Sequence, residues 1–222
     1  MRDPSAKGGF SSVTVEHVVE ACMTLPEPGW HRIVHDHPEP RPAATLVPIV
    51  DVGGRAAVIV TLRAASLEHG GDWVFPGGGV DHTDSSHLDA ARRDASEELG
   101  VSRGRIEVVG QLATRGPIVS GFVIEAYVGI IAGLLDLQVD ADEVADVAVV
   151  AIDDLLRAES HHRGPARTER RLDHSTLERL GLGSVLSDLR HYRVRDEEFL
   201  WGLQADILYD LLHHVTGGAH EF

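Results

Sequence analysis

Apolar and polar residues along the chain follow two periods, and each period predicts a different secondary structure. Apolar side chains fall on one helical face over residues 13–23, which predicts a short amphipathic helix. Two apolar runs, Ala43–Val50 and Ala56–Leu62, are separated by Asp51-Val52-Gly53-Gly54 and predict a β-hairpin. The Pro- and His-rich stretch 24–42, between the helix and the hairpin, predicts a loop.

The rest of the pattern predicts a mixture of strands and helices. An apolar stripe from Leu88 to Leu99 predicts a helix over 85–99. The other predicted elements are strands over Ile106–Leu112, Phe122–Ala132 and Val144–Ile152, and helices over Asp153–Ala158 and Leu203–Leu212. Because strands and helices alternate irregularly, without a repeat or a domain linker, we expect one α/β domain with a mixed sheet over 13–222. Residues 1–12 have the composition of a disordered arm.

Composition and charge narrow the classes of partner. The chain has 222 residues, 43% of them hydrophobic, and no apolar run as long as a membrane span. A formal net charge of −15 disfavours nucleic acid and anionic membranes as main partners. The N-terminus lacks the apolar segment of a secretory signal, and Cys22 is the only cysteine. A reducing compartment, the cytoplasm, is therefore expected.

Residues 92–100, RRDASEELG, place three carboxylates in five positions. On a helix, Asp94, Glu97 and Glu98 fall within about 100° of arc, beside the apolar stripe. Arg93 can pair with Glu97 one turn away, but Asp94 and Glu98 have no basic partner at that spacing. Such a cluster is either a solvated acidic face or a site for a hard divalent cation, which binds carboxylate oxygens.

A glycine-rich loop precedes the acidic helix. Val74-Phe75 can end a strand, and Pro76 and the three glycines 77–79 follow it. Glycines let a backbone approach a ligand closely, and a glycine-rich loop before a helix is a known phosphate-binding arrangement. The same composition is also common in plain turns.

Taken together, the loop and the helix resemble the signature of the Nudix hydrolases. Residues 93–100 supply its second half: Arg, an acid, one apolar and one variable position, two glutamates, one further residue and a final glycine. Asp94 stands where the family usually has Glu. The spacing from Gly78 to Arg93 is one residue longer than in the commonest form, and Asp84 occupies the place of the spacer acid. A subgroup of coenzyme A pyrophosphatases has this longer spacing.

Other stretches also resemble the coenzyme A subgroup, over roughly residues 40–213. Thr61-Leu62-Arg63-Ala64 followed by Phe75-Pro76-Gly77-Gly78 resembles its upstream signature, which usually carries a second basic residue where Glu68 and His69 stand here. Weaker landmarks are Arg41-Pro42-Ala43-Ala44, Ser120-Gly121-Phe122 and Trp201-Gly202.

The resemblance implies a Nudix-like α/β/α sandwich that hydrolyses a diphosphate linkage in a nucleoside diphosphate derivative. It implies Mg²⁺ or Mn²⁺ as cofactor and a homodimer as a frequent assembly. The catalytic and metal-binding candidates that it implies are Asp94, Glu97 and Glu98, with Arg93 orienting Glu97. The substrate-binding candidates are Arg63, Gly77 and Gly78, whereas Asp84 is expected to shape the loop.

Several alternatives remain open at this level. The substrate can be coenzyme A, ADP-ribose or a related nucleotide, and a shorter Asp94 that fails to coordinate metal would leave a non-catalytic nucleotide-binding module. The general base can be a helix acid or Glu143. The basic segment 157–174 is either a loop or a lid over an anionic substrate, and Trp201 is either a core residue or a stacking platform. Fourteen histidines lack zinc-motif spacing, so structural zinc is not expected.

Overall fold

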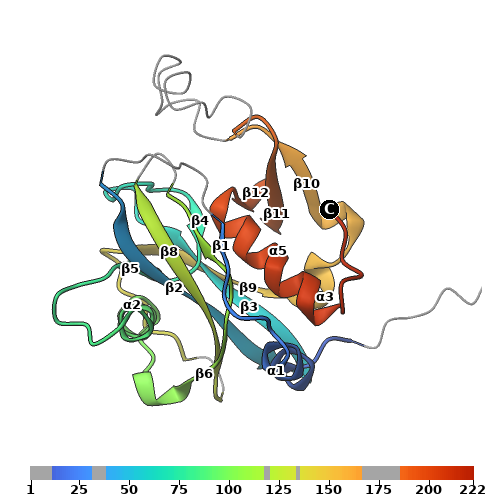
Figure 1. Cartoon of the computed structure of the whole chain (residues 1–222), viewed down its shortest axis with the longest axis horizontal. Helices are drawn as coiled ribbons and strands as arrows, with labels where there is room; N and C mark the ends of the chain where they lie inside the picture. The colour runs from blue at the N-terminus through green and yellow to red at the C-terminus, as the bar shows by residue number, and fades with distance from the viewer. Residues whose placement is uncertain (1–11, 32–38, 118–120, 134–135, 167–185) are drawn as a thin grey trace, which may run out of the picture.

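The chain folds around a mixed β-sheet that lies between two groups of helices (Figure 1). The computed structural model describes residues 12–31, 39–117, 121–133, 136–166 and 186–222. The helices are α1 (Val15–Met23), α2 (His87–Leu99), α3 (Ile152–Leu155) and α5 (Leu203–Val215), with 3-10 turns at Arg103–Arg105 and Ala158–Ser160. No helix in the described part of the chain combines the length and apolar character needed to cross a bilayer.

Strands β2 and β3 form the centre of the sheet. The strands are β1 (Trp30–His31), β2 (Arg41–Val52), β3 (Arg55–Arg63), β4 (Trp73–Val74), β5 (Gly77–Gly79), β6 (Ile106–Gln111), β7 (Thr114–Arg115), β8 (Phe122–Ile131), β9 (Val144–Ala151), β10 (His161–Gly164), β11 (Leu189–Arg195) and β12 (Glu198–Trp201). β2 pairs antiparallel with β3 and with β5, and parallel with β8. β3 also pairs antiparallel with β9 and β4.

Side chains of the central strands point alternately to the two faces of the sheet, where they pack into two separate cores. On β2, Val47 and Ile49 face α1 and α5, whereas Leu46 and Val50 face α2. A strand that is covered on both faces reads as a continuous apolar run, which is the pattern that predicted the hairpin. The result is the expected α/β/α sandwich, with α2 on one face and α1 and α5 on the other (Figure 1).

Helix α2 packs closely on the sheet because its inner face is made of small residues. Ala90, Ala91 and Ala95 are fully buried against β2 and β3, and Leu99 fills the end of the contact. Ser86 caps the start of the helix by accepting a hydrogen bond from the Asp89 N–H. Gly100 ends it in the left-handed conformation, with φ of 66°. The helix thus ends where the sequence predicted and begins two residues after the predicted start.

The predicted hairpin and the strands after α2 are confirmed, but several elements were missed. The stretch 24–42 was predicted to be a loop, yet β1 lies within it and β2 begins at Arg41. Strands β10 to β12 were not predicted, because histidine and arginine occupy many of their positions and hide the apolar alternation. Helix α3 is shorter than predicted.

Two sequence-based predictions fall partly or wholly outside the described residues. Residues 1–11, most of the predicted arm, are not described. Of the basic segment 157–174, residues 157–166 are described and include β10, and the rest is not. The choice between loop and lid therefore stays open.

Leu99→Ala tests the contact between α2 and the sheet. Leu99 is fully buried, so its truncation is expected to lower the free energy of unfolding by about 2–5 kcal/mol. Urea denaturation measures the change. Met23→Ala, at a side chain that is 79% exposed, is the control and should change stability by no more than about 0.5 kcal/mol. Equal effects of the two substitutions would contradict this packing.

Candidate active site

The glycine-rich loop runs as a short strand along the edge of β2. Gly77 and Gly78 pair with Thr45 and Ala44, and the Thr45 hydroxyl donates a hydrogen bond to the Pro76 carbonyl at 2.8 Å. A Cβ on Gly77 would lie 2.3 Å from the Ala44 carbonyl oxygen. Any side chain at Gly77 would therefore push β5 away from β2.

Asp94 and Glu98 lie on the buried face of α2 and point toward this glycine strand. Glu98 accepts hydrogen bonds from the Gly77 N–H at 3.0 Å and from the Thr61 hydroxyl at 3.3 Å. The Asp94 Oδ2 atom is buried and has no hydrogen-bond partner among the described residues. A Cβ on Gly78 would lie 3.1 Å from this oxygen, so the glycine leaves the space in front of Asp94 open.

Burial makes ionisation of both carboxyl groups costly. Desolvation raises the pKa of Asp94 to about 6, although Arg93 opposes the shift. It raises the pKa of Glu98 to about 7, against the stabilising effects of the Gly77 N–H and Arg63. The negative charges of Glu97, Asp84 and Glu143 add to the rise at Asp94. The site therefore holds more negative charge than the neighbouring cations balance.

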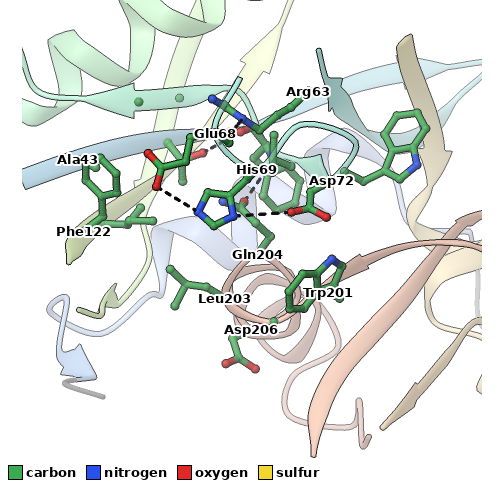
Figure 2. Close-up of a pocket in the computed structure, with 18 of the residues that line it drawn as sticks. Ala43, Arg63, Glu68, His69, Asp72, Phe122, Trp201, Leu203, Gln204 and Asp206 are labelled. Carbon is green, nitrogen blue, oxygen red and sulfur yellow. Dashed lines mark hydrogen bonds and ion pairs between the residues drawn. The ribbon is translucent and has the colours of Figure 1, made fainter. Parts of the chain in front are cut away.

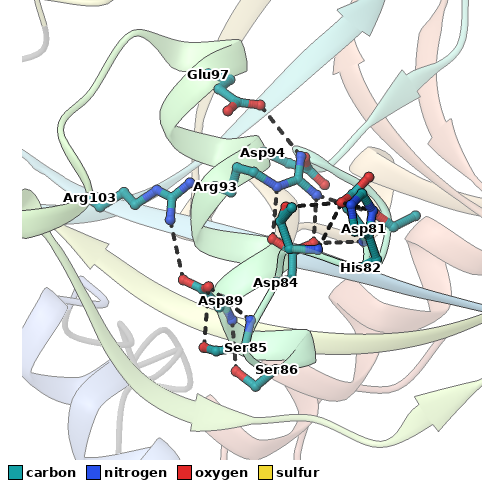
Figure 3. Close-up of polar contacts among 12 residues, drawn as sticks. Asp81, His82, Asp84, Ser85, Ser86, Asp89, Arg93, Asp94, Glu97 and Arg103 are labelled. Atoms are coloured by element: carbon teal, nitrogen blue, oxygen red, sulfur yellow. Dashed lines mark hydrogen bonds and ion pairs between the residues drawn. The ribbon is translucent and has the colours of Figure 1, made fainter.

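Arg93 ties the helix to the loop that precedes it (Figure 3). Its guanidinium donates two hydrogen bonds of 2.9 Å to Asp84 and a third to Asp94. The contact with Arg93 lowers the pKa of Asp84 to about 2. Asp84 also accepts from the Asp81 N–H at 2.8 Å. Asp84 thus closes the loop over residues 81–84, the shaping role that the sequence predicted for it.

Glu97 is placed differently from the other two acids of the cluster. Its side chain is 60% exposed, and one oxygen lies 3.5 Å from Arg93, the pairing expected from the sequence (Figure 3). Only Asp94 and Glu98 face the glycine strand.

The residues present fit a divalent cation that is completed by substrate. Among the described residues, no three His, Cys, Asp or Glu side chains converge as a ready-made metal site. Mg²⁺, however, is commonly held by one or two carboxylates together with waters and substrate phosphates. The partnerless Oδ2 of Asp94 is the kind of oxygen that such an ion would take.

A cavity of about 400 Å³ lies beside the glycine strand, and Figure 2 shows side chains that line it. Gly77, Gly78 and Arg63 line it, and so do two rings on opposite walls, Phe122 and Trp201. Gln204, at the start of α5, accepts a hydrogen bond from the Phe75 N–H at 3.2 Å and fixes the lower wall to the loop.

Several residues of this cavity were not found by sequence reasoning. Trp201 was thought more typical of the core, yet it lines the cavity and is only partly buried. Asp72 and Gln204 carry no sequence signal, because each comes from a loop or helix end brought in by the fold. His69 stands out in the sequence only as one of the residues in place of a basic one. Glu143 lies near enough to the buried acids for its charge to raise the pKa of Asp94.

The raised pKa values predict how stability changes with pH in the absence of metal. The carboxyl groups ionise near 4 when unfolded and near 6 and 7 in the fold, so the folded chain holds more protons in this window. The free energy of unfolding should therefore be greatest below about pH 4 for these groups and fall as pH rises to about 7. Urea unfolding in chelator at several pH values measures this slope.

Glu98→Gln should flatten that slope, because it removes one of the two groups. Gln keeps an oxygen for the Gly77 N–H, so metal-free stability near pH 7.5 should equal or exceed that of the parent. Glu107→Gln, on the exposed side of β6, is the control and should leave the slope unchanged. A Glu98→Gln protein that unfolds far more easily would mean that Glu98 is a structural partner.

Comparison with known proteins identifies the family to which the chain belongs. The NUDIX domain model matches residues 39–172, more than half of the chain. An uncharacterized Nudix hydrolase NudL from Cronobacter sakazakii is 36% identical over 174 residues, covering 77% of this chain and 81% of the relative. The NudL protein of Salmonella heidelberg is 32% identical over 204 residues, covering 90% and 94%.

A solved structure shares the fold at lower identity. The MutT/nudix family protein from Enterococcus faecalis has a TM-score of 0.53 and 18% identity, over 83% of this chain and 65% of that one. At this identity the likeness concerns the fold alone. The family match and the NudL relatives decide the assignment: the chain belongs to the Nudix family of hydrolases.

Proposed function

We propose that this Nudix pyrophosphohydrolase uses Mg²⁺ or Mn²⁺ to cleave the diphosphate linkage of a nucleoside diphosphate derivative. The observation that carries the proposal is the buried, partnerless Oδ2 of Asp94, with Glu98 one turn away and the open strand Gly77–Gly79 in front. A buried carboxylate oxygen without a hydrogen-bond partner destabilises a fold unless a ligand satisfies it. A cation and the phosphate oxygens that it binds would supply that ligand.

The roles of the side chains follow from their positions. Asp94 and Glu98 would hold the cation, with Glu97 joining from the exposed side of α2. When bound, the ion would offset the charge of the diphosphate and lower the pKa of the attacking water. Arg93 would orient Asp94 and Glu97, because it contacts both. Either a helix acid or Glu143, whose charge already acts on Asp94, would accept the proton from water.

The cavity beside the glycine strand would take the rest of the substrate. Arg63 lies on the cavity wall and near Glu98, so it can contact the substrate close to the diphosphate. Phe122 and Trp201 offer apolar rings for the organic part. Coenzyme A is the first candidate, on the resemblance around Arg63, and ADP-ribose or another nucleotide is the alternative.

A non-catalytic nucleotide-binding module is the competing hypothesis, because Asp94 is shorter than the usual glutamate. The burial of Asp94 favours a catalytic site over such a module. A binding module without metal would gain stability by replacing Asp94 and Glu98 with neutral residues, since both are costly to ionise.

We also propose that the protein acts in the cytoplasm and assembles as a homodimer. Its partner would be a small-molecule substrate rather than nucleic acid or membrane.

A substrate panel with and without metal tests the proposal. Coenzyme A, ADP-ribose and dinucleotides are incubated with Mg²⁺ or Mn²⁺, and mass spectrometry identifies the products. We expect cleavage between the two phosphates, and we expect a chelator to abolish it. A binding module would bind nucleotide in calorimetry without any turnover.

Glu98→Gln should lower kcat/KM by at least about 100-fold, because it removes one charge and one ligand from the cation. The metal-induced rise in melting temperature should also shrink. Glu107→Gln is the matched control and should retain parental activity. A Glu98→Gln enzyme that keeps more than a tenth of parental activity would contradict the role of Glu98 as a ligand of the cation.

A further inference from the structure

One wall of the cavity carries three charged or titratable residues in the loop between β3 and β4. Glu68, His69 and Asp72 all line the cavity, and Figure 2 shows the His69 ring between the two carboxylates. The ring nitrogens lie 3.9 Å from Glu68 and 3.8 Å from Asp72. His69 has a φ of 60°, a left-handed conformation that is uncommon for residues other than glycine and that aims its ring at the cavity.

The charge of this wall is negative whichever state His69 adopts. Two carboxylates face at most one imidazolium, so the three side chains sum to −1 or −2. Arg63 is the nearby lining cation, but its Nε donates to the Glu68 carbonyl and its charge acts on Glu98 at the diphosphate end. On the opposite wall, Asp206 is paired with Arg190 at 2.5 Å and leaves no net positive charge.

We infer that this acidic wall makes the enzyme prefer nucleoside diphosphate derivatives that present hydroxyl groups to the cavity over those that carry a phosphate monoester there. The inference rests on the proposed function and narrows its substrate class. Carboxylates only accept hydrogen bonds, and hydroxyl groups can donate them to Glu68 and Asp72. A phosphate monoester carries about −1.5 to −2 charges at pH 7 and has little to donate.

The apolar part of the cavity makes this selection effective. Phe122 and Trp201 occupy the walls beside the acidic loop, so a bound ring displaces water between ligand and wall. Repulsion between like charges strengthens as the water that screens it is removed. The charge on the wall therefore acts on ligand groups held within a few ångströms.

Matched pairs of substrates test the inference. Coenzyme A is compared with its 3′-dephospho form, and NADPH with NADH, because each pair differs by one phosphate monoester. With saturating Mn²⁺ and low salt, kcat/KM should favour the dephosphorylated member of at least one pair by about tenfold or more. The ratio should shrink at 0.5 M salt, because added ions screen the repulsion.

Charge-neutral variants locate the effect on the wall. Glu68→Gln, Asp72→Asn and the double variant preserve size, and each should lower the ratio toward one, chiefly by improving KM for the phosphorylated member. Thermal melting checks that each variant is folded. Glu107→Gln removes the same charge on β6, away from the cavity, and should leave the ratio unchanged.

The outcomes separate the two proposals. If neither the paired compounds nor ADP-ribose is cleaved, the proposed function fails and the inference fails with it. If ADP-ribose is cleaved but no member of either pair is, the inference alone is overturned. If compounds are cleaved but both members of each pair react equally, or if Glu107→Gln changes the ratio as much as the double variant does, the inference alone is overturned. A ratio that favours the phosphorylated members would overturn it as well.

Discussion

Two carboxyl groups are buried against a strand of bare backbone, and the rest of the site is built to make that burial tolerable. Asp94 and Glu98 occupy the inner face of α2, where most helices would place apolar side chains. Glu98 is satisfied by a backbone N–H and a hydroxyl, which only partly replace lost hydration. One oxygen of Asp94 has no hydrogen-bond partner among the described residues, so a cation bound beside the glycine strand would stabilise the ionised carboxylate.

The neighbouring sequence features serve this arrangement. Alanines on α2 let the helix approach β2 closely, and the glycines of β5 leave room for the acids beneath it. Arg93 and Asp84 join the loop to the helix with two parallel hydrogen bonds, which fix the entry to α2. Arg93 also contacts one oxygen of Asp94 and partly offsets the charge of that acid. Stability lost at the acids is offset by the two apolar cores on either face of the sheet.

Much of this was predictable from the sequence, and the exceptions have physical reasons. The central hairpin, α2 and its end at Gly100 followed from apolar periodicity and a left-handed glycine. The crowding of acids pointed to α2, but helical geometry alone placed Glu97 with Asp94 and Glu98. Periodicity gives angles around a helix, and only packing against β5 decides which acids are buried. On the far wall of the cavity, the sequence favours a core position for Trp201 over a stacking platform and gives no signal for Gln204, since both come from over a hundred residues away.

The cavity is assembled from two parts of the chain that lie far apart in the sequence. The acids, the glycine strand and Arg63 lie inside the stretch that matches the Nudix domain, residues 39–172. Trp201, Gln204 and the start of α5 lie beyond it. Mutations in this C-terminal part can reshape the pocket without altering the residues of α2 or of the glycine strand. Such a division would let substrate preference change through one end of the chain while the helix that carries the buried acids stays the same.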